Sequence, residues 1–179
     1  NITKRTLNSW DEQEIDEYDA VLIHGLNQIP DGLINSLIPW VQNGHGLWVV
    51  PSSTSQLTSY NRLLSSFNAG QFVGQIGNYG SFEAQTNADE IIENHPLFDG
   101  LFEREEREEL EIDPISIYYQ FRHNASDADG GYKLIRNSFD DPLLFGKAFG
   151  NGQLLISSIG YDAGFSNIHL KPIFLSLIH

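Results

Sequence analysis

Residues 18–25, YDAVLIHG, and residues 46–53, GLWVVPSS, decide the fold of this chain. The first run is apolar and ends at a glycine, and the second ends in a bend of small residues. Short, wholly apolar strands are typical of parallel sheets that helices cover on both faces. The residues between the two runs have helical periodicity, so we predict a right-handed strand–helix–strand crossover.

The helix between the two runs has clear start and stop signals. Asp31 after Pro30 can cap its first turn, and Gly44 ends it. Pro39 removes one backbone hydrogen bond, which predicts a bend or an early end of the regular helix. One face is apolar at helical spacing and consists of Leu33, Ile34, Leu37, Ile38 and Val41.

A second helix is expected after the bend. The four residues 52–55 offer hydroxyl side chains that can cap it. Its apolar positions are Leu57, Tyr60, Leu64 and Phe67.

The second half of the chain has the pattern of antiparallel hairpins. Tight-turn residues at 140–142 (DDP) and 150–152 (GNG) separate short apolar segments. A last amphipathic helix is expected within Phe165–Ile178, and the charged stretch 103–111 is expected to be solvated or, alternatively, to dock a basic partner. The predicted strands are Ile115–Arg122, Tyr132–Arg136, Leu143–Phe149 and Gln153–Ser158.

Composition limits the classes of function. The chain of 179 residues is expected to form a single domain, 1–179, and because it has no methionine we expect it to be a fragment of a longer protein. A formal charge of -14 disfavours nucleic acid and anionic membrane surfaces as partners. No stretch approaches the ~20 apolar residues that cross a bilayer. The absence of cysteine excludes disulfides, thiolate metal sites and a catalytic thiol.

Ser52 and Ser53 stand where a strand-to-helix elbow would display a nucleophile at the carboxyl edge of the sheet. Such an elbow needs glycines two positions to either side of the nucleophile, and neither serine has them. Helix capping is therefore the favoured role of these serines, and we predict no catalytic residue.

His24 and Gly25 end the first strand at the same edge. The histidine could act as a base or a ligand contact, and the glycine amide could hold an anion, although a structural histidine is the favoured interpretation. No two histidines lie three or four residues apart, and no dinucleotide or P-loop motif occurs, so we expect neither a metal nor a cofactor.

Aromatic side chains suggest a further possibility, carbohydrate binding, although most aromatics at helical or strand spacing belong to the core. The residues considered are Trp40, Trp48, Tyr79, Tyr118 and Tyr119.

Residues 18–23, the helix up to residues 43–46 (NGHG) and residues 47–51 (LWVVP) together resemble the class I glutamine amidotransferase-like fold. Residues 95–102 (HPLFDGLF) and 150–157 (GNGQLLIS) extend the resemblance over nearly the whole chain. It implies an α/β, flavodoxin-like or amidotransferase-like three-layer sandwich, with a parallel sheet core in the first half and antiparallel hairpin strands in the second. The segments are most similar to a non-catalytic branch in the extracytoplasmic part of aerotolerance-type, BatA-like bacterial membrane proteins.

The chain departs from the active members of that family. Active amidotransferases carry a cysteine at the elbow and, after a late strand, a histidine followed two places on by an acid. Here the elbow has serines, and the late strand continues into residues 159–162 (IGYD), which leaves only Asp162 near the acid position. The resemblance therefore implies the fold without the activity.

We expect a non-enzymatic, degenerate amidotransferase-like domain that binds a protein partner or a small ligand. The candidate residues of this ligand edge are His24, Gly25, Ser52, Ser53 and Asp162. The resemblance places the domain in a membrane-anchored envelope protein on the periplasmic side, with the cytoplasm left open as a location. The alternatives are a serine hydrolase that uses Ser52 or Ser53 with His24, and a carbohydrate-binding module.

Overall fold

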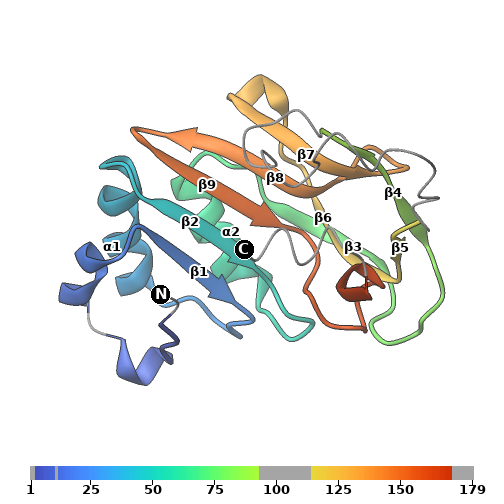
Figure 1. The fold of residues 1–179 in the computed structure, drawn as a ribbon, viewed down its shortest axis with the longest axis horizontal. Helices are drawn as coiled ribbons and strands as arrows, with labels where there is room; N and C mark the ends of the chain where they lie inside the picture. Colours follow the sequence, from blue (N-terminus) through green and yellow to red (C-terminus); the bar gives the residue numbers. More distant parts are fainter. Residues whose placement is uncertain (1–2, 11, 93–113, 171–179) are drawn as a thin grey trace, which may run out of the picture.

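The computed structural model describes residues 3–10, 12–92 and 114–170, which form a mixed α/β arrangement (Figure 1). The α-helices are α1 (Asp31–Gln42) and α2 (Leu57–Ser66), and single 3-10 turns include η4 (Asp127–Asp129) and η5 (Ile168–Leu170). The strands are β1 (Ala20–His24), β2 (Gly46–Val50), β3 (Phe72–Gly77), β4 (Thr86–Ile91), β5 (Ser116–Ile117), β6 (Tyr119–His123), β7 (Gly131–Asn137), β8 (Pro142–Phe149) and β9 (Gly152–Ser157).

Seven of these strands form the central sheet in the order β1-β2-β9-β8-β7-β4-β5, and β3 pairs with β6 in a separate two-stranded sheet. β1 and β2 are parallel, as expected, and β9 joins them as a third parallel strand. The pairs β9-β8, β8-β7, β7-β4 and β4-β5 are antiparallel. The predicted hairpins of the second half are confirmed, and the parallel core is smaller than the antiparallel part of the sheet.

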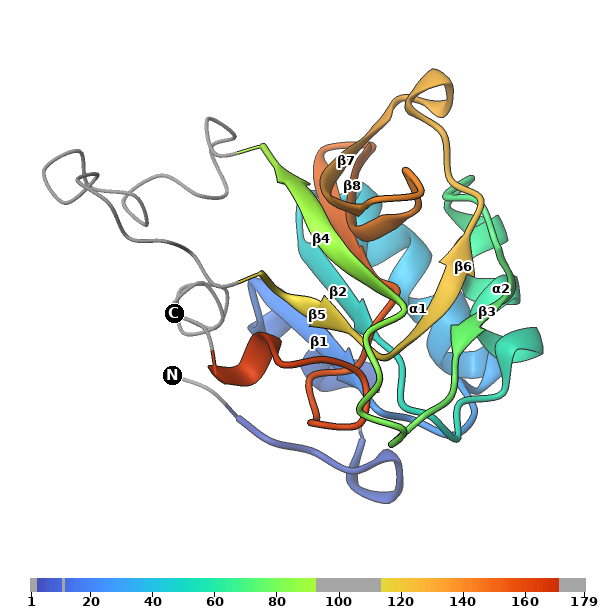
Figure 2. The ribbon, with the colours of Figure 1, turned by 90° about the vertical axis from the view of Figure 1, so that its right-hand side faces the viewer.

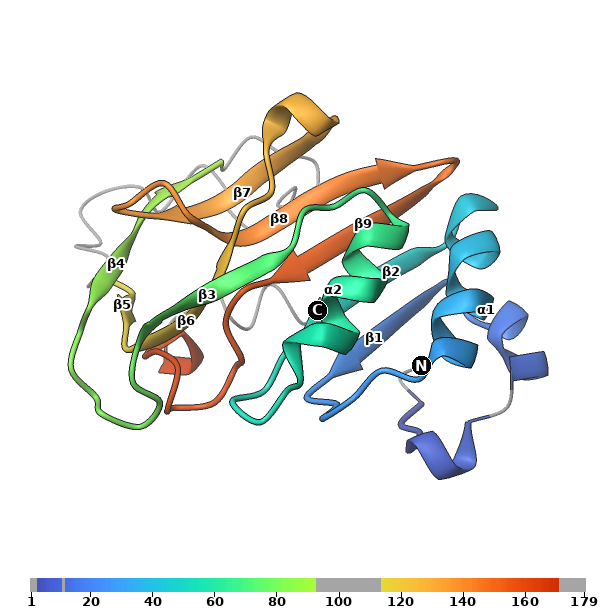
Figure 3. The same ribbon diagram turned by 180° about the vertical axis from the view of Figure 1, so that it is seen from behind.

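Both α-helices lie on the same face of the sheet, together with the β3-β6 pair (Figures 2 and 3). The expectation that helices cover both faces of β2 is therefore wrong for the described residues. On the opposite face, Trp48 of β2 donates a hydrogen bond from Nε1 to Ser157 Oγ at 3.1 Å and meets the edge of the Tyr161 ring. Side chains of the chain that follows β9, rather than a helix, pack there.

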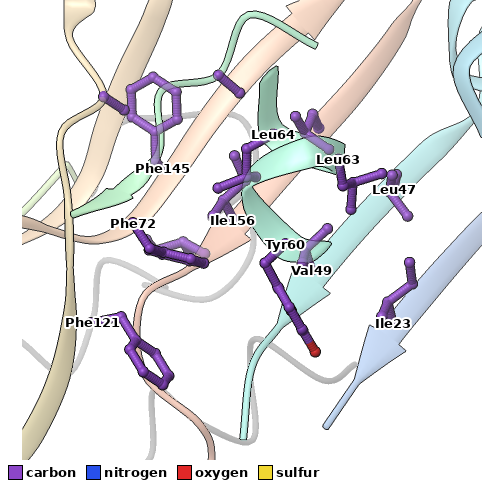
Figure 4. Close-up of a cluster of buried hydrophobic side chains, with 14 of the residues drawn as sticks. Ile23, Leu47, Val49, Tyr60, Leu63, Leu64, Phe72, Phe121, Phe145 and Ile156 are labelled. Atoms are coloured by element: carbon purple, nitrogen blue, oxygen red, sulfur yellow. The ribbon is translucent and has the colours of Figure 1, made fainter. Parts of the chain in front are cut away.

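The core fills the space between the sheet and α2 (Figure 4). Leu47 and Val49 of β2 and Ile156 of β9 point toward the helix, and Tyr60 and Leu64 of α2 pack onto them with no exposed surface. Alternation along β2 and helical spacing along α2 thus bury one face of each element, as the sequence predicts.

The structure bears on two expected details of α1, the effect of Pro39, for which a bend or an early end was expected, and the cap by Asp31. The helix continues past Pro39 to Gln42 without an early end. Pro30 occupies the N-cap position with no side-chain cap, and Asp31 is the first helical residue, where it forms an ion pair with Arg62 of α2.

The last predicted helix is described only up to Leu170, as the turn η5, so residues 171–178 lie outside the described part of the chain. The charged stretch 103–111 also lies outside it. Within residues 3–10, 12–92 and 114–170, no helix has the length and apolar character needed to cross a bilayer.

Candidate functional site

The carboxyl ends of the three parallel strands meet at one edge of the sheet, as such strands must. Gly25 after β1 donates a backbone hydrogen bond to the Val50 carbonyl at 2.9 Å. A Cβ built on Gly25 would lie 3.7 Å from Ser52 Cβ, and one built on Gly160, after β9, would lie 2.9 Å from the Pro51 carbonyl oxygen. The loops after β1, β2 and β9 are therefore in contact, and the sequence-predicted residues of the ligand edge share this end of the sheet.

The serines after β2 form hydrogen bonds that stabilise the loop in which they lie. Ser52 Oγ lies 3.2 Å from Thr54 Oγ1 and 3.3 Å from Ser55 Oγ. Ser55 Oγ accepts from the Ser52 amide at 2.9 Å and donates to the Leu26 carbonyl at 2.8 Å. The predicted capping role is wrong, because α2 begins after Gln56 and has no side-chain cap. The hydroxyls instead tie the β2-α2 loop to the segment that follows β1.

Asp162 is brought to Ser53 through a residue of another loop. Tyr79, in the β3-β4 connection, donates its phenol hydrogen to Asp162 Oδ1 at 2.9 Å, and the Gly164 amide donates to the same oxygen at 2.9 Å. The hydrogen bond to Asp162 raises the pKa of Tyr79, and the Ser53 hydroxyl, which also reaches the phenol, acts in the opposite direction. Tyr79 is thus hydrogen-bonded to Asp162, after β9, and lies close enough to Ser53, after β2, for that hydroxyl to influence its pKa.

His24 and Gly25 are less well placed for chemistry than the sequence suggested. The His24 ring is exposed and has no hydrogen-bond partner among the described residues. Gly25 uses its amide to extend the β1-β2 ladder, so this amide is not available to an anion. Within the described part of the chain no hydrogen bond joins His24 to Ser52 or Ser53, so the contact that a serine hydrolase uses in its base step is not made here.

Only part of the aromatic set faces solvent. Trp40 is 3% exposed and Tyr119 is 6% exposed, so both belong to the core, and Trp48 is half-buried on the sheet. Tyr79 is 49% exposed, and Tyr118, in the bend that leads into β6, is half-buried. Tyr79 is therefore the member of this set with the most exposed side chain.

Phe82 lies three positions after Tyr79 in the β3-β4 connection and was not among the sequence-predicted residues. Its side chain is 64% exposed and meets the edge of Tyr118 at a centroid distance of 5.9 Å. Its φ angle is +56°, a left-handed conformation that bulky residues seldom adopt. Turn residues around it, at 78–81 (NYGS), were the only available sequence signal.

A concave region lies between α1 and α2, with a volume of about 390 Å³. Its polar groups serve the fold: Arg62 pairs with Asp31, Asn61 exchanges two hydrogen bonds with the Phe72 backbone, and Gln71 donates to Ser65. Among the described residues no group of three or more His, Asp or Glu side chains is arranged to hold a metal ion.

Comparison with known proteins gives a fold and no family. No family model and no curated protein matches the chain. Among solved structures, the cytoplasmic protein STM3548 from Salmonella typhimurium matches 94% of this chain over 72% of its own length, with a TM-score of 0.63 and 16% identity. The cytoplasmic protein STM1381 from Salmonella typhimurium LT2 matches 86% of this chain over 65% of its own length, with a TM-score of 0.60 and 16% identity.

A β-galactosidase from Rahnella sp. R3 matches 90% of this chain with a TM-score of 0.60 and 16% identity, but the match covers 22% of that enzyme. This chain therefore corresponds to about a fifth of the enzyme's length. At such identities the similarity shows the fold alone.

Proposed function

We propose that this chain is a non-enzymatic binding domain with an amidotransferase-like, flavodoxin-like sandwich fold, whose ligand or protein partner sits at the ligand edge. The convergence of Ser52, Ser53 and Asp162 at the carboxyl ends of adjacent parallel strands is the observation that carries the proposal. Ligands of open α/β sheets bind outside the carboxyl ends of the strands.

The absence of catalytic function is proposed on the residues themselves. A serine nucleophile needs a base within hydrogen-bonding distance, and the Ser52 hydroxyl is engaged with Thr54 and Ser55 instead. Asp162 receives hydrogen bonds from a phenol and an amide, and neither group can take up a proton from a hydroxyl nucleophile at neutral pH.

The cellular setting is part of the same proposal. We place the domain in the extracytoplasmic part of a bacterial membrane protein, on the resemblance to BatA-like proteins. Two structural neighbours are described as cytoplasmic proteins, which makes the cytoplasm the competing location. Fractionation of cells that express the full-length protein, with an antibody to this domain and a protease-protection step, separates the two locations.

A hydrolysis assay tests the proposal directly. Purified protein is incubated with glutamine and with 4-nitrophenyl acetate, beside the Ser52→Ala and Ser53→Ala variants. We expect the wild type and both variants to have the same background rate. A wild-type rate that either substitution abolishes would contradict the proposal and support the serine hydrolase alternative. Heteronuclear NMR of the wild type, with the amides of residues 52 and 53 as reporters, detects ligand binding independently of any turnover.

A further inference from the structure

We propose that the ligand of this edge is an uncharged oligosaccharide of equatorially substituted pyranoses, which stacks on Tyr79 and Phe82 and hydrogen-bonds to Asp162. This inference rests on the proposed function and names the ligand class for the same site. It follows from the position and packing of three side chains.

The Tyr79 ring is exposed but held in place. A Cβ on Gly164 would lie 2.4 Å from a Tyr79 ring atom, so the ring lies directly against the Gly164 backbone. Tyr119 and Phe165 meet the ring in edge-to-face contacts at centroid distances of 6.1 and 5.5 Å. The phenol is bound to Asp162 and the Gly80 amide donates to the Gly164 carbonyl. A ring fixed in this way needs little further ordering when a sugar stacks on it.

Phe82 adds a second ring in a conformation that the fold does not otherwise favour. A phenylalanine with positive φ and 64% exposure gains little from burial and bears backbone strain. Strain of this kind is common at ligand-binding sites. Phe82 lies in the same β3-β4 connection as Tyr79, three positions further along, and its ring meets the edge of Tyr118.

Asp162 supplies the polar part of the site. Its Oδ1 atom accepts from Tyr79 and Gly164, whereas Oδ2 has no partner among the described residues. A carboxylate oxygen that is fixed in position and open to solvent accepts hydrogen bonds from neighbouring sugar hydroxyls.

Charge and shape select the sugar. The carboxylate of Asp162 and the formal charge of -14 disfavour uronic acids and other anionic sugars. A pyranose with equatorial substituents presents a flat face of C–H groups to an aromatic ring, while its hydroxyls point outward around the rim. This geometry allows one sugar to contact a ring by its face and Asp162 by its edge.

The test uses defined probes and matched variants. Cellohexaose and chitohexaose are titrated into the protein by NMR and calorimetry, with hexagalacturonate as the anionic comparison. We expect saturable binding of at least one neutral probe and none of the anionic one. Tyr79→Ala and Phe82→Asn are each expected to weaken binding about 10-fold, the effect of losing one aromatic stacking contact.

Phe139→Ala is the matched control, because Phe139 is 61% exposed and has no ring contact with Tyr79, Tyr118 or Phe82 in the described structure. We expect it to bind as the wild type does. Phe82→Asn should keep the melting temperature of the wild type, because asparagine tolerates positive φ, so its loss of binding cannot be assigned to unfolding.

Four outcomes would overturn the inference. Binding that survives both Tyr79→Ala and Phe82→Asn would place the sugar elsewhere. Binding of hexagalacturonate in preference to the neutral probes would contradict the role of Asp162. A third outcome is that neither neutral probe binds while an amino acid or peptide shifts the amide signals of Ser52 and Ser53. The ligand would then not be an oligosaccharide, but the proposal of a binding site at the ligand edge would be supported. No response to any of these ligands would count against both proposals.

Discussion

The polar side chains near the two ends of strand β6 differ in exposure: they lie at the surface at one end and are buried at the other. At the Tyr119 end, the phenol of Tyr79, the carboxylate of Asp162 and the hydroxyl of Ser53 lie at the surface. At the other end, His123 is 2% exposed and its Nε2 donates to the Ala69 carbonyl at 2.7 Å, between the rings of Phe72 and Phe145.

The histidine at the buried end has the more strongly perturbed titration. Burial lowers the pKa of His123 to about 4, against a weaker opposing contribution from its hydrogen bond to the Ala69 carbonyl. Shifted pKa values often mark functional sites. Here the shift reports enclosure by aromatic rings, in a region where Lys147 also donates to the Asn68 carbonyl at 2.7 Å. This end of β6 anchors the turn after α2, whereas the other end faces solvent.

The largest effect on stability is expected at the buried end. His123→Ala leaves a cavity beside Phe72 and removes the donor of the Ala69 carbonyl, so it should lower the free energy of unfolding by about 3–4 kcal/mol. Urea denaturation measures this loss. The exposed His24→Ala variant is the control and should change stability by less than about 0.5 kcal/mol. Equal losses at both histidines would remove the contrast between the two ends.

The pH dependence of stability should follow from the same side chain. The folded-state pKa of His123, about 4, lies below the ordinary value of 6.5, so the native state binds fewer protons than the unfolded state between these values. The stabilising contribution is complete above pH 6.5 and is lost as the pH falls toward 4, about 3 kcal/mol in total. Denaturation at a series of pH values measures the slope. His123→Gln, which keeps a side-chain donor and does not titrate, should flatten the curve in this window, and an unchanged slope would assign it to other groups.

At the exposed end, adding a methyl group at Gly164 should change the position of the Tyr79 ring more than it changes the stability of the fold. Gly164→Ala places a Cβ against the far end of the Tyr79 ring, so the ring must move and its hydrogen bond to Asp162 is disturbed. We expect a stability loss of about 1 kcal/mol, at the low end of the cost of overpacking. The fluorescence of the tyrosines and the NMR shifts of the Tyr79 ring should change clearly. A loss as large as that of His123→Ala would mean that Tyr79 is a core residue.

The smallest effect is expected at Phe82. Phe82→Asn relieves a left-handed phenylalanine and removes its edge contact with Tyr118, two changes of opposite sign that should leave unfolding within about 1 kcal/mol of the wild type. Thermal denaturation tests this value. A clear destabilisation would show that the ring serves the fold rather than the surface.

The local elements of the fold could be predicted from the sequence, since hydrophobic periodicity marks β1, α1, β2 and α2 and the turns at 140–142 and 150–152 mark the late hairpins. β3 and β4 were missed for physical reasons. β3 contains Gly74 and Gly77, and the β4 segment Thr86–Ile91 is mostly polar, so neither has the apolar alternation of a strand. Their pairing with β6 and β7 decides their structure.

The candidate site, too, has a part that could be predicted from the sequence and a part that could not. The predicted strand–helix–strand crossover placed Ser52 and Ser53 at the carboxyl edge of the sheet, because parallel strands share their direction, whereas only the resemblance to amidotransferases pointed to Asp162. The contact that joins Asp162 to Ser53 runs through Tyr79, a loop residue whose position depends on packing against Gly164. Loop packing of that kind leaves no periodic signal in a sequence.

The position of β9 has a consequence for how the chain reaches its native state. β9 lies between β2 and β8, and its Ser157 bonds to Trp48 across 109 positions of sequence. The middle of the sheet therefore closes only after a long stretch of polypeptide has been synthesised and brought back, which is a non-local step that slows folding. On the ribosome, β1 and β2 emerge first, and the edge of β2 that pairs with β9 stays unpaired until β9 has been synthesised. A nascent chain whose β9 segment is still inside the ribosome should be open to proteases and to strand exchange, and emergence of β9 from the tunnel should protect it.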